Sequence, residues 1–314
     1  MNTIIFYHND LDGLISALGF AYNDYMQNHL KRPDYKTLRK EYYFYEVSYG
    51  IENIFNNLKR QSIDLSFFTN VIILDYCFDK KTMLKFLEIY NKNLIWIDHH
   101  KNVIKEYTDQ EISGLRDHNN SAAVLVWKYF NKEPPVFTQY VEDMDIWKWQ
   151  LPDSKEILQY LDFLYMALKK NKEKAFDIIE EFLRFLDNNY FKKNLDKFIE
   201  FGKIINKYLE IKVVDDISSG KKTHFEGINT FIVNTQIKPG YISEHIFNSE
   251  DYKDIELVII WYRYYLNKEN PEYFDKISLR SKNIDCSIIA KKYGGNGHPK
   301  ASGFIIDDIS NLSK

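Results

Sequence analysis

The sequence predicts an α/β protein with an N-terminal parallel sheet carrying helices on both faces, a helical connector and a smaller mixed α/β C-terminal domain. Short apolar runs alternate with helical patterns over the first half, as is typical of parallel strands covered by helices. Pro152-Asp-Ser154 interrupts this alternation, and a long stretch at helical spacing follows. At 314 residues the length favours two domains. The expected divisions are residues 1–154, a connector at 155–210, and residues 211–314.

Each element of the first half has a simple reason in the sequence. Apolar and aromatic runs bounded by polar residues predict the strands, and amphipathic or small-residue runs predict the helices between them. Ser121 precedes an apolar run and is a good N-cap. The expected strands are residues 3–7, 42–47, 71–74 and 94–97, and the expected helices are residues 13–22, 80–90, 121–130 and 136–147.

The second half changes character at residue 211. Before it, the regularly spaced aromatic residues are expected to pack on a core rather than to bind a ligand. After it, β-branched runs indicate strands, with one helix before the last of them. The expected strands are residues 211–214, 230–233, 256–261, 276–280 and 303–306, and the expected helix is 287–293.

Composition excludes several functional classes. The formal net charge is −3, so the basic face that holds a long nucleic acid through many phosphates is not expected. Short RNA or DNA oligonucleotides or small nucleotides suit this balance better. No apolar run is long enough to cross a membrane, and the first residues lack the basic segment of a signal peptide. Cys77 and Cys286 have no metal-ligand spacing and are expected to be buried thiols in a reducing cytoplasm.

Acidic and imidazole side chains follow three of the expected strands. His8, Asp10 and Asp12 follow the first strand, and alternation in an extended chain would project them to one side. Asp75 ends the third strand, and Asp98, His99 and His100 end the fourth. The carboxyl ends of parallel strands meet at one edge, where ligands bind. The set suits Mn²⁺, Fe²⁺ or Co²⁺ and predicts two divalent ions, with Asp75 as the bridging carboxylate.

One more acid is expected on the helix at 136–147. Asp143 and Asp145 are two residues apart and cannot share a helical face, so at most one of them is expected to bind metal. Asp143 is the preferred ligand here, and Asp145 is the alternative.

A glycine-rich segment near the carboxyl end is the second functional signal. Gly294, Gly295 and Gly297 surround Asn296 and precede His298, and exposed backbone N–H groups in such a loop can hold an anion. A helix is expected before it and a strand after it, which is the reverse of a dinucleotide-binding fingerprint. Upstream, Arg280 and Ser281 stand at the end of an expected strand, where an arginine can bind phosphate through two hydrogen bonds.

These motifs together resemble the DHH superfamily of phosphoesterases. The run His-Asn-Asp-Leu-Asp-Gly, the lone Asp75, the segment Asp98-His99-His100 and Glu-Asp-Met-Asp-Ile-Trp are most similar to the NrnB-like oligoribonuclease or cyclic-nucleotide phosphodiesterase branch. Ser-Leu-Arg-Ser followed by Gly-Gly-x-Gly-His resembles the DHH-associated C-terminal domain. Asn296 stands where the family usually has a third glycine, and asparagine tolerates positive φ better than most residues.

The resemblance implies a role for each residue. His8, Asp10 and Asp75 would hold one metal ion, manganese being the first expectation and Mg²⁺ another choice. Asp12, Asp75, His99 and Asp143 would hold the other. Asp98 would orient a ligating imidazole, and His100 would donate to the substrate phosphate and protonate the leaving oxygen.

The function that follows is hydrolysis of short oligonucleotides to nucleoside monophosphates by a cytoplasmic monomer or homodimer. Two alternatives stay open. One is a phosphodiesterase of cyclic or linear dinucleotides, or a phosphatase of 3′-phosphonucleotides. The other is a nucleotide-binding sensor that has lost turnover, against which the complete ligand set argues.

Overall fold

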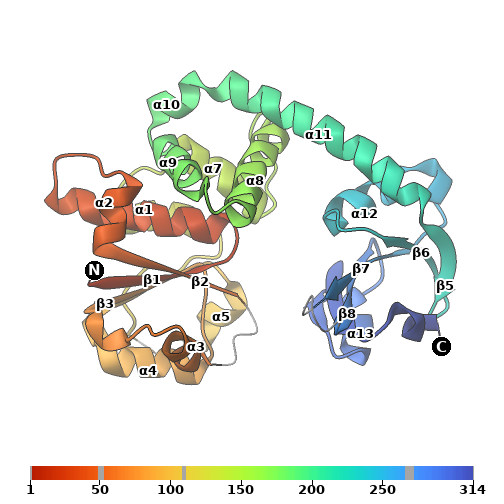
Figure 1. Cartoon of the computed structure of the whole chain (residues 1–314), viewed down its shortest axis with the longest axis horizontal. Coiled ribbons are helices and arrows are strands. Elements are labelled where there is room, and N and C mark those ends of the chain that lie inside the picture. Colours follow the sequence, from red (N-terminus) through yellow and green to blue (C-terminus); the bar gives the residue numbers. More distant parts are fainter. Residues whose placement is uncertain (1, 49–52, 108–110, 266–271, 314) are drawn as a thin grey trace. The chain divides into compact units, whose positions relative to one another are not determined.

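The structure is a computed structural model that describes residues 2–48, 53–107, 111–265 and 272–313. It divides into two compact units, Met1–Ile204 and Ile205–Lys314, which we call unit 1 and unit 2. Figure 1 shows both, joined through the long helix α11 (Leu195–Ser218). The predicted α/β fold class is confirmed.

Unit 1 is built on a four-stranded parallel sheet in the order β2-β1-β3-β4. Its strands are β1 (Thr3–His8), β2 (Tyr42–Val47), β3 (Asn70–Leu74) and β4 (Leu94–Ile97). The sheet is apolar on both faces, because alternate residues of β1 and β3 belong to two different cores. The predicted strands of the first half are therefore all present.

Helices cover both faces of this sheet. The helices of unit 1 are α1 (Leu11–Asn28), α2 (Tyr35–Glu41), α3 (Ile54–Arg60), α4 (Lys80–Tyr90), α5 (Lys101–Glu106), α6 (Ala122–Tyr129), α7 (Val136–Asp145), α8 (Ser154–Lys170), α9 (Ala175–Phe185) and α10 (Asn188–Lys193). Figure 1 shows α1 and α7 to α9 on one face, and α3 and α4 on the other. Ser121 caps α6 as predicted, accepting a hydrogen bond from the Val124 N–H.

Much of the segment 155–210 lies within unit 1. Ile157, Phe182 and Phe198, from α8, α9 and α11, belong to the same core as α1 and the sheet. Phe182, Phe185 and Phe198 pack there as the sequence predicts, whereas Phe201 is exposed. The structure divides the chain within α11, so the first part of that helix lies in unit 1 and the rest in unit 2.

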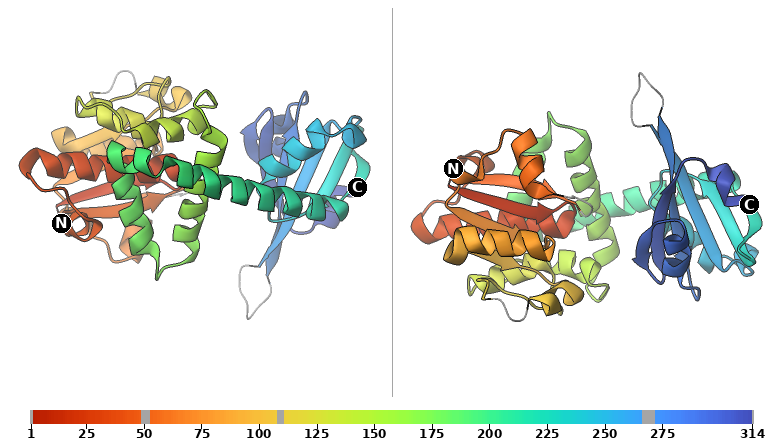
Figure 2. Two further views of the ribbon diagram at one scale, coloured as in Figure 1. Left: turned by 90° about the horizontal axis from the view of Figure 1, so that it is seen from above. Right: turned by 90° about the horizontal axis from the view of Figure 1, so that it is seen from below.

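Unit 2 contains a six-stranded mixed sheet in the order β5-β6-β7-β8-β10-β9. The strands are β5 (Lys221–Phe225), β6 (Ile228–Asn234), β7 (Leu257–Tyr265), β8 (Tyr273–Ser281), β9 (Asn296–His298) and β10 (Ala301–Ile306), and the helices are α12 (Pro239–Asn248) and α13 (Cys286–Lys292). Helices α11 and α12 pack on one face and α13 on the other. Figure 2 shows β7 and β8 as a long hairpin.

Two sequence predictions are wrong. The strand expected at residues 211–214 is part of α11, because Val213 and Ile217, one helical turn apart, pack into the core against α12 and β6. Burial of residues at helical spacing therefore outweighs the strand preference of the β-branched side chains. In addition, Asp12 does not extend the first strand, since α1 already begins at Leu11.

Candidate metal centre

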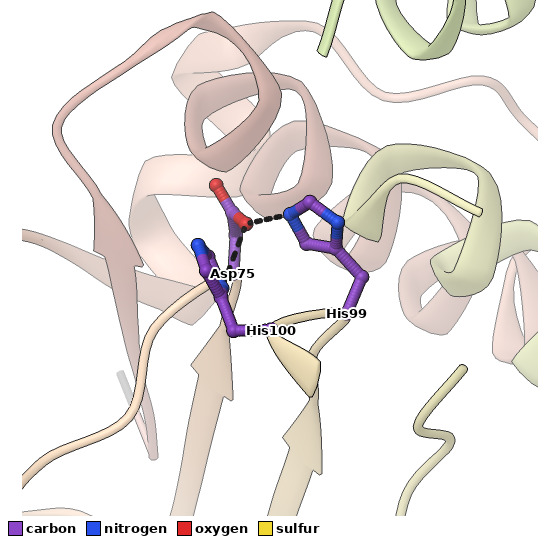
Figure 3. A group of neighbouring side chains, drawn as sticks. All are labelled: Asp75, His99 and His100. Carbon is purple, nitrogen blue, oxygen red and sulfur yellow. Dashed lines mark ion pairs between the residues drawn. The ribbon is translucent and has the colours of Figure 1, made fainter. Parts of the chain in front are cut away.

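Acidic and imidazole side chains from several elements of unit 1 meet at the carboxyl edge of its sheet. His8 ends β1, Asp75 directly follows β3, and His99 and His100 follow β4 by two and three residues. Because all four strands are parallel, these positions lie at the same edge. Figure 3 shows Asp75 with the rings of His99 and His100 around its carboxylate.

Three overlapping groups of potential ligand atoms, each within 4.8 Å of one another, form this cluster. Asp75 belongs to two groups and His99 to two, so each could serve neighbouring ions. The groups are His8, Asp10 and Asp75; Asp75, His99 and His100; and Asp12, His99 and Asp145.

Asp75 lies at the centre of the cluster and is almost completely buried. Its backbone takes φ 54°, which aspartate tolerates better than most residues, and its N–H donates to the Ile97 carbonyl over 2.9 Å. Oδ1 lies 3.1 Å from His99 Nε2, and Oδ2 lies 3.7 Å from His8 Nδ1. Burial, and next the charge of Asp12, raise the pKa of Asp75 well above its usual range.

Asp10 and Asp12 are positioned by helix ends rather than by an extended strand. Asp10 is the N-cap of α1: Oδ1 accepts from the Gly13 N–H over 2.9 Å, and Oδ2 contacts His8 Nδ1 at 2.5 Å. Asp12, in the first turn of α1, accepts from the N–H groups of Ala122 and Ala123 at 2.8 and 2.9 Å. Its carboxylate thereby holds the start of α6, and burial raises its pKa.

Gly13 makes this turn from β1 into α1 feasible. A Cβ at this position would lie 2.2 Å from the carbonyl oxygen of His8, which is backbone and cannot rotate away. The glycine therefore allows the close approach of α1 to the end of β1.

The structure brings Asp145, and not Asp143, into the cluster. Asp145 Oδ2 lies 3.3 Å from His99 Nε2. The carboxylate of Asp143 points into the following loop, where it accepts hydrogen bonds from Gln150 N, Leu151 N and Ser154 Oγ at 2.8, 3.3 and 2.6 Å. The geometry therefore favours the alternative ligand, Asp145, over the preferred Asp143, because the Asp145 carboxylate faces His99 and that of Asp143 faces the loop.

Asp98 orients His100. Its Oδ1 accepts from His100 Nδ1 at 2.7 Å and from the backbone N–H groups of His99 and His100, while Oδ2 accepts from Trp96 Nε1 at 3.2 Å. Burial opposes charge on His100, but the hydrogen bond to Asp98 and the charges of Asp98 and Asp75 together outweigh it and raise the His100 pKa. The second imidazole of the pair is therefore held in one orientation with its protonated form favoured.

The electrostatics of the cluster fit divalent cations. Burial, and next the charge of Asp12, raise the pKa of Asp145 to about 9. Burial also disfavours charge on His8, yet hydrogen bonds to Asp10 and Asp75 raise its pKa to about 10. Within the described part of the chain, Asp75 Oδ1 and Asp145 Oδ2 are buried oxygens without a hydrogen-bond donor. Carboxylates with imidazoles suit first-row divalent metals, and a cation would satisfy both oxygens.

Helix α8 adds two side chains that sequence reasoning missed. Tyr165 and Lys169 lie close enough to Asp10 for its charge to act on both. The Lys169 ammonium pairs with the carboxylate of Glu46, at the end of β2. No motif marks these residues, and the helical spacing of α8 shows only that one of its faces packs on a core.

In unit 2, the predicted anion-binding residues fall around the β8–β10–β9 ladder. Arg280 pairs with Ala301, which pairs in turn with His298, so Arg280 and His298 share one row and one sheet face, with a small residue between them. Arg280 is half-buried and donates to the Leu279 carbonyl over 2.9 Å, and burial lowers its pKa.

The other predicted residues there shape the backbone. Ser281 Oγ accepts from the N–H groups of Asn283 and Ile284. Gly294 and Gly297 have φ of 74° and 143°, and a Cβ on Gly295 would lie 2.2 Å from the Gly303 carbonyl oxygen. Asn296 begins β9, and its side chain lies outside the described set.

Comparison with known proteins gives relatives at low identity. No protein-family model matches the chain. An uncharacterized protein of Acanthamoeba polyphaga mimivirus is 24% identical over 296 residues, covering 85% of this chain and 63% of that protein. The oligoribonuclease NrnB of Bacillus subtilis is 27% identical over 243 residues, covering 68% of this chain and 52% of that protein. The chain therefore spans between about half and two thirds of the length of these curated relatives.

Solved structures are similar over nearly the whole chain. A DHH domain described as a member of the s1p family of ribosomal proteins gives a TM-score of 0.58 at 16% identity, covering 97% of this chain and 82% of that one. PggH of Vibrio cholerae, a pGpG-specific phosphodiesterase, gives 0.51 at 13%, covering 99% and 95%. RecJ of Thermus thermophilus in complex with Mn²⁺ gives 0.51 at 13%, covering 99% and 50%. These likenesses show the fold.

Proposed function

We propose that this chain, which has the fold of the DHH superfamily as its motifs predicted, is a metal-dependent phosphodiesterase that hydrolyses short oligonucleotides to nucleoside monophosphates. The observation that carries the proposal is the cluster of buried and half-buried carboxylates and imidazoles at the carboxyl edge of the unit 1 sheet. Its like charges are costly to bury together unless cations bind among them.

The overlapping groups support a proposal for the metal ligands. His8, Asp10 and Asp75 would hold one ion, and Asp12, Asp75, His99 and Asp145 would hold the second. Manganese is the expected metal. Divalent cations at such a site supply Lewis acidity and activate water for attack on phosphorus.

His100 is the proposed proton donor. Its Nδ1 is bound to Asp98, and the raised pKa favours the imidazolium, in which Nε2 also carries a proton. Such a cation stabilises negative charge on the phosphate oxygens and can transfer its proton to the leaving oxygen. Asp98 acts by holding the ring.

Arg280 and His298, in unit 2, are proposed to bind a phosphate group. They share one row of the unit 2 sheet, and among the described residues Arg280 has no carboxylate partner. A charge-assisted pair of contacts to phosphate suits a guanidinium. The net charge of −3 favours short ligands over long ones. NrnB is an oligoribonuclease and PggH is a pGpG-specific phosphodiesterase, and these activities support this substrate class.

The test is a product time course with the purified chain and Mn²⁺. Substrates would be RNAs of two to five nucleotides, a long single strand, cyclic dinucleotides and a 3′-phosphonucleotide. Asp75→Asn should abolish turnover, whereas Asp177→Asn, an exposed aspartate on α9, should leave it unchanged. Release of monophosphates from the short RNAs supports the proposal. Preference for a dinucleotide or a 3′-phosphonucleotide would replace the substrate, and metal binding without turnover of any substrate would favour a sensor.

A further inference from the structure

Two tryptophans beside the metal centre are exposed. Trp147 and Trp149 are 78% and 43% exposed, whereas Trp96 and Trp127 are 1% and 7% exposed. The two exposed rings contact each other edge to face, with centroids 5.9 Å apart at 71°. Large aromatic side chains are usually well buried, and exposed tryptophans are enriched where a protein binds a partner or ligand.

The loop that presents these rings has a defined backbone. Trp147 and Trp149 have φ of 58° and 51°, a left-handed conformation that is rare for bulky residues. At Trp147 this conformation ends helix α7, because the Trp147 N–H donates to the Met144 carbonyl and the Lys148 N–H donates to the Asp143 carbonyl, the pattern of a helix C-terminus. The chain therefore turns out of α7 at Trp147 and leaves both rings exposed.

Asp143 enforces this loop conformation. Its backbone carbonyl accepts from the N–H groups of Lys148 and Trp149 at 2.9 and 3.2 Å. Its buried carboxylate accepts from Gln150, Leu151 and Ser154, as described above. Asp143 therefore fixes the backbone that follows Trp147, from Lys148 to Ser154.

The loop starts at the metal centre itself. Asp145 is the last residue of α7 and belongs to the ligand cluster, and Trp147 follows it by two residues. Two residues span at most about 7 Å, so the backbone carrying Trp147 stays next to the cluster. In the sequence, Lys148 lies between the two tryptophans, and its ammonium group pairs with Glu142 Oε1 at 2.6 Å. The aromatic pair therefore offers stacking surface with its neighbouring charge neutralised.

We propose that Trp147 and Trp149 form a stacking platform for the nucleobase next to the phosphate that the metal centre holds. The identity of this ligand rests on the proposed function. An aromatic face accepts any base, so the platform would favour nucleotides over other phosphate esters without selecting a sequence. Asp143 is then the positioning residue of the platform.

The test compares Trp147→Ala and Trp149→Ala with the unaltered chain on two substrates. One is a short oligoribonucleotide, and the other is the same sugar-phosphate backbone without bases. Loss of one stacked base should raise KM by about 5- to 150-fold on the first substrate and leave kcat and the base-free substrate unchanged. Trp→Phe variants should retain most of the affinity. Phe67→Ala, which removes an exposed ring before β3 at the opposite edge of the sheet, should have no effect.

A binding measurement separates this inference from the proposed function. A nucleoside monophosphate should quench tryptophan emission of the unaltered chain, and much less that of the Trp147→Phe, Trp149→Phe double variant. Quenching without hydrolysis of any phosphodiester would refute the function and support the platform. Hydrolysis with equal KM in all variants, or an equal loss on the base-free substrate, would refute the platform and leave the function standing.

Discussion

Replacing Asp145 with asparagine should stabilise the metal-free protein while removing metal binding. The side chain is 22% exposed, lies 3.3 Å from His99 and shares its site with Asp12 and Asp75. Burial and these two carboxylates raise its pKa to about 9, from 3.8 for an ordinary aspartate. The native state therefore keeps a proton that the unfolded chain releases.

The magnitude follows from that difference in pKa. Between pH 3.8 and about 9 the native state binds the extra proton, so the stability of the unaltered chain falls as pH rises. Each pH unit in this window costs about 1.36 kcal/mol, which amounts to about 4 kcal/mol between pH 5 and pH 8. Asparagine cannot ionise, so the free energy of unfolding of Asp145→Asn, relative to that of the unaltered chain, should rise by up to about 4 kcal/mol between pH 5 and pH 8.

The assay is urea unfolding in the presence of a chelator at pH 5 and pH 8. Trp96 and Trp127 are buried in unit 1 and report its unfolding by their emission. Asp143→Asn is the matched control, because it should lose stability by about 2 kcal/mol or more at both pH values through its weakened hydrogen bonds. A stability difference that is the same at both pH values would refute the reasoning. So would Mn²⁺ stabilising Asp145→Asn as strongly as the unaltered chain.

Three further perturbations have defined outcomes. Gly13→Ala should destabilise unit 1 by about 1–3 kcal/mol and weaken Mn²⁺ binding, since the alanine Cβ would overlap the His8 carbonyl. Thermal unfolding with and without Mn²⁺ measures the stability and the metal binding, and an unchanged midpoint would contradict this prediction. Below pH 10, Mn²⁺ affinity should rise about tenfold per pH unit for each proton that the metal displaces, because His8, with a pKa of about 10, must lose its proton to bind the ion. Calorimetry in buffers of different ionisation enthalpy would detect the released proton. A constant Kd from pH 6 to 9 would exclude this proton displacement. Asp275→Asn should destabilise unit 2 by about 3 kcal/mol, because the fully buried Asp275 accepts two 2.8 Å hydrogen bonds from Arg263. Hydrogen exchange should show a loss of amide protection in unit 2, with unit 1 and Mn²⁺ binding unaffected.

The sequence predicted that His8, Asp75 and His99 would lie at one edge of the sheet, and it did so for a physical reason. Apolar runs that end in His8, Asp75 and His99 mark parallel strands, and the carboxyl ends of such strands meet whatever the details of the connecting helices. The order in which strands and ligands follow one another along the chain is therefore enough to place these three residues together.

The sequence pattern was insufficient where tertiary packing determined whether a segment formed a strand or a helix. Residues 211–214 are rich in β-branched side chains, yet Val213 and Ile217 continue a helix because that spacing buries both of them. Asp12 continues the alternation of His8 and Asp10, yet it belongs to α1, where it also holds the start of α6 through Ala122 and Ala123. Both outcomes depend on residues distant in sequence.

Asp143 and Asp145 show most clearly what the sequence determines and what only the tertiary structure determines. The sequence determined that only one of them could join the cluster, because residues two apart on a helix point about 200° from each other. Only the tertiary structure decided which one. The rotation of α7 is set by its packing on α6 and α8, and this turns Asp145 toward His99 and Asp143 toward the loop that carries the exposed tryptophans.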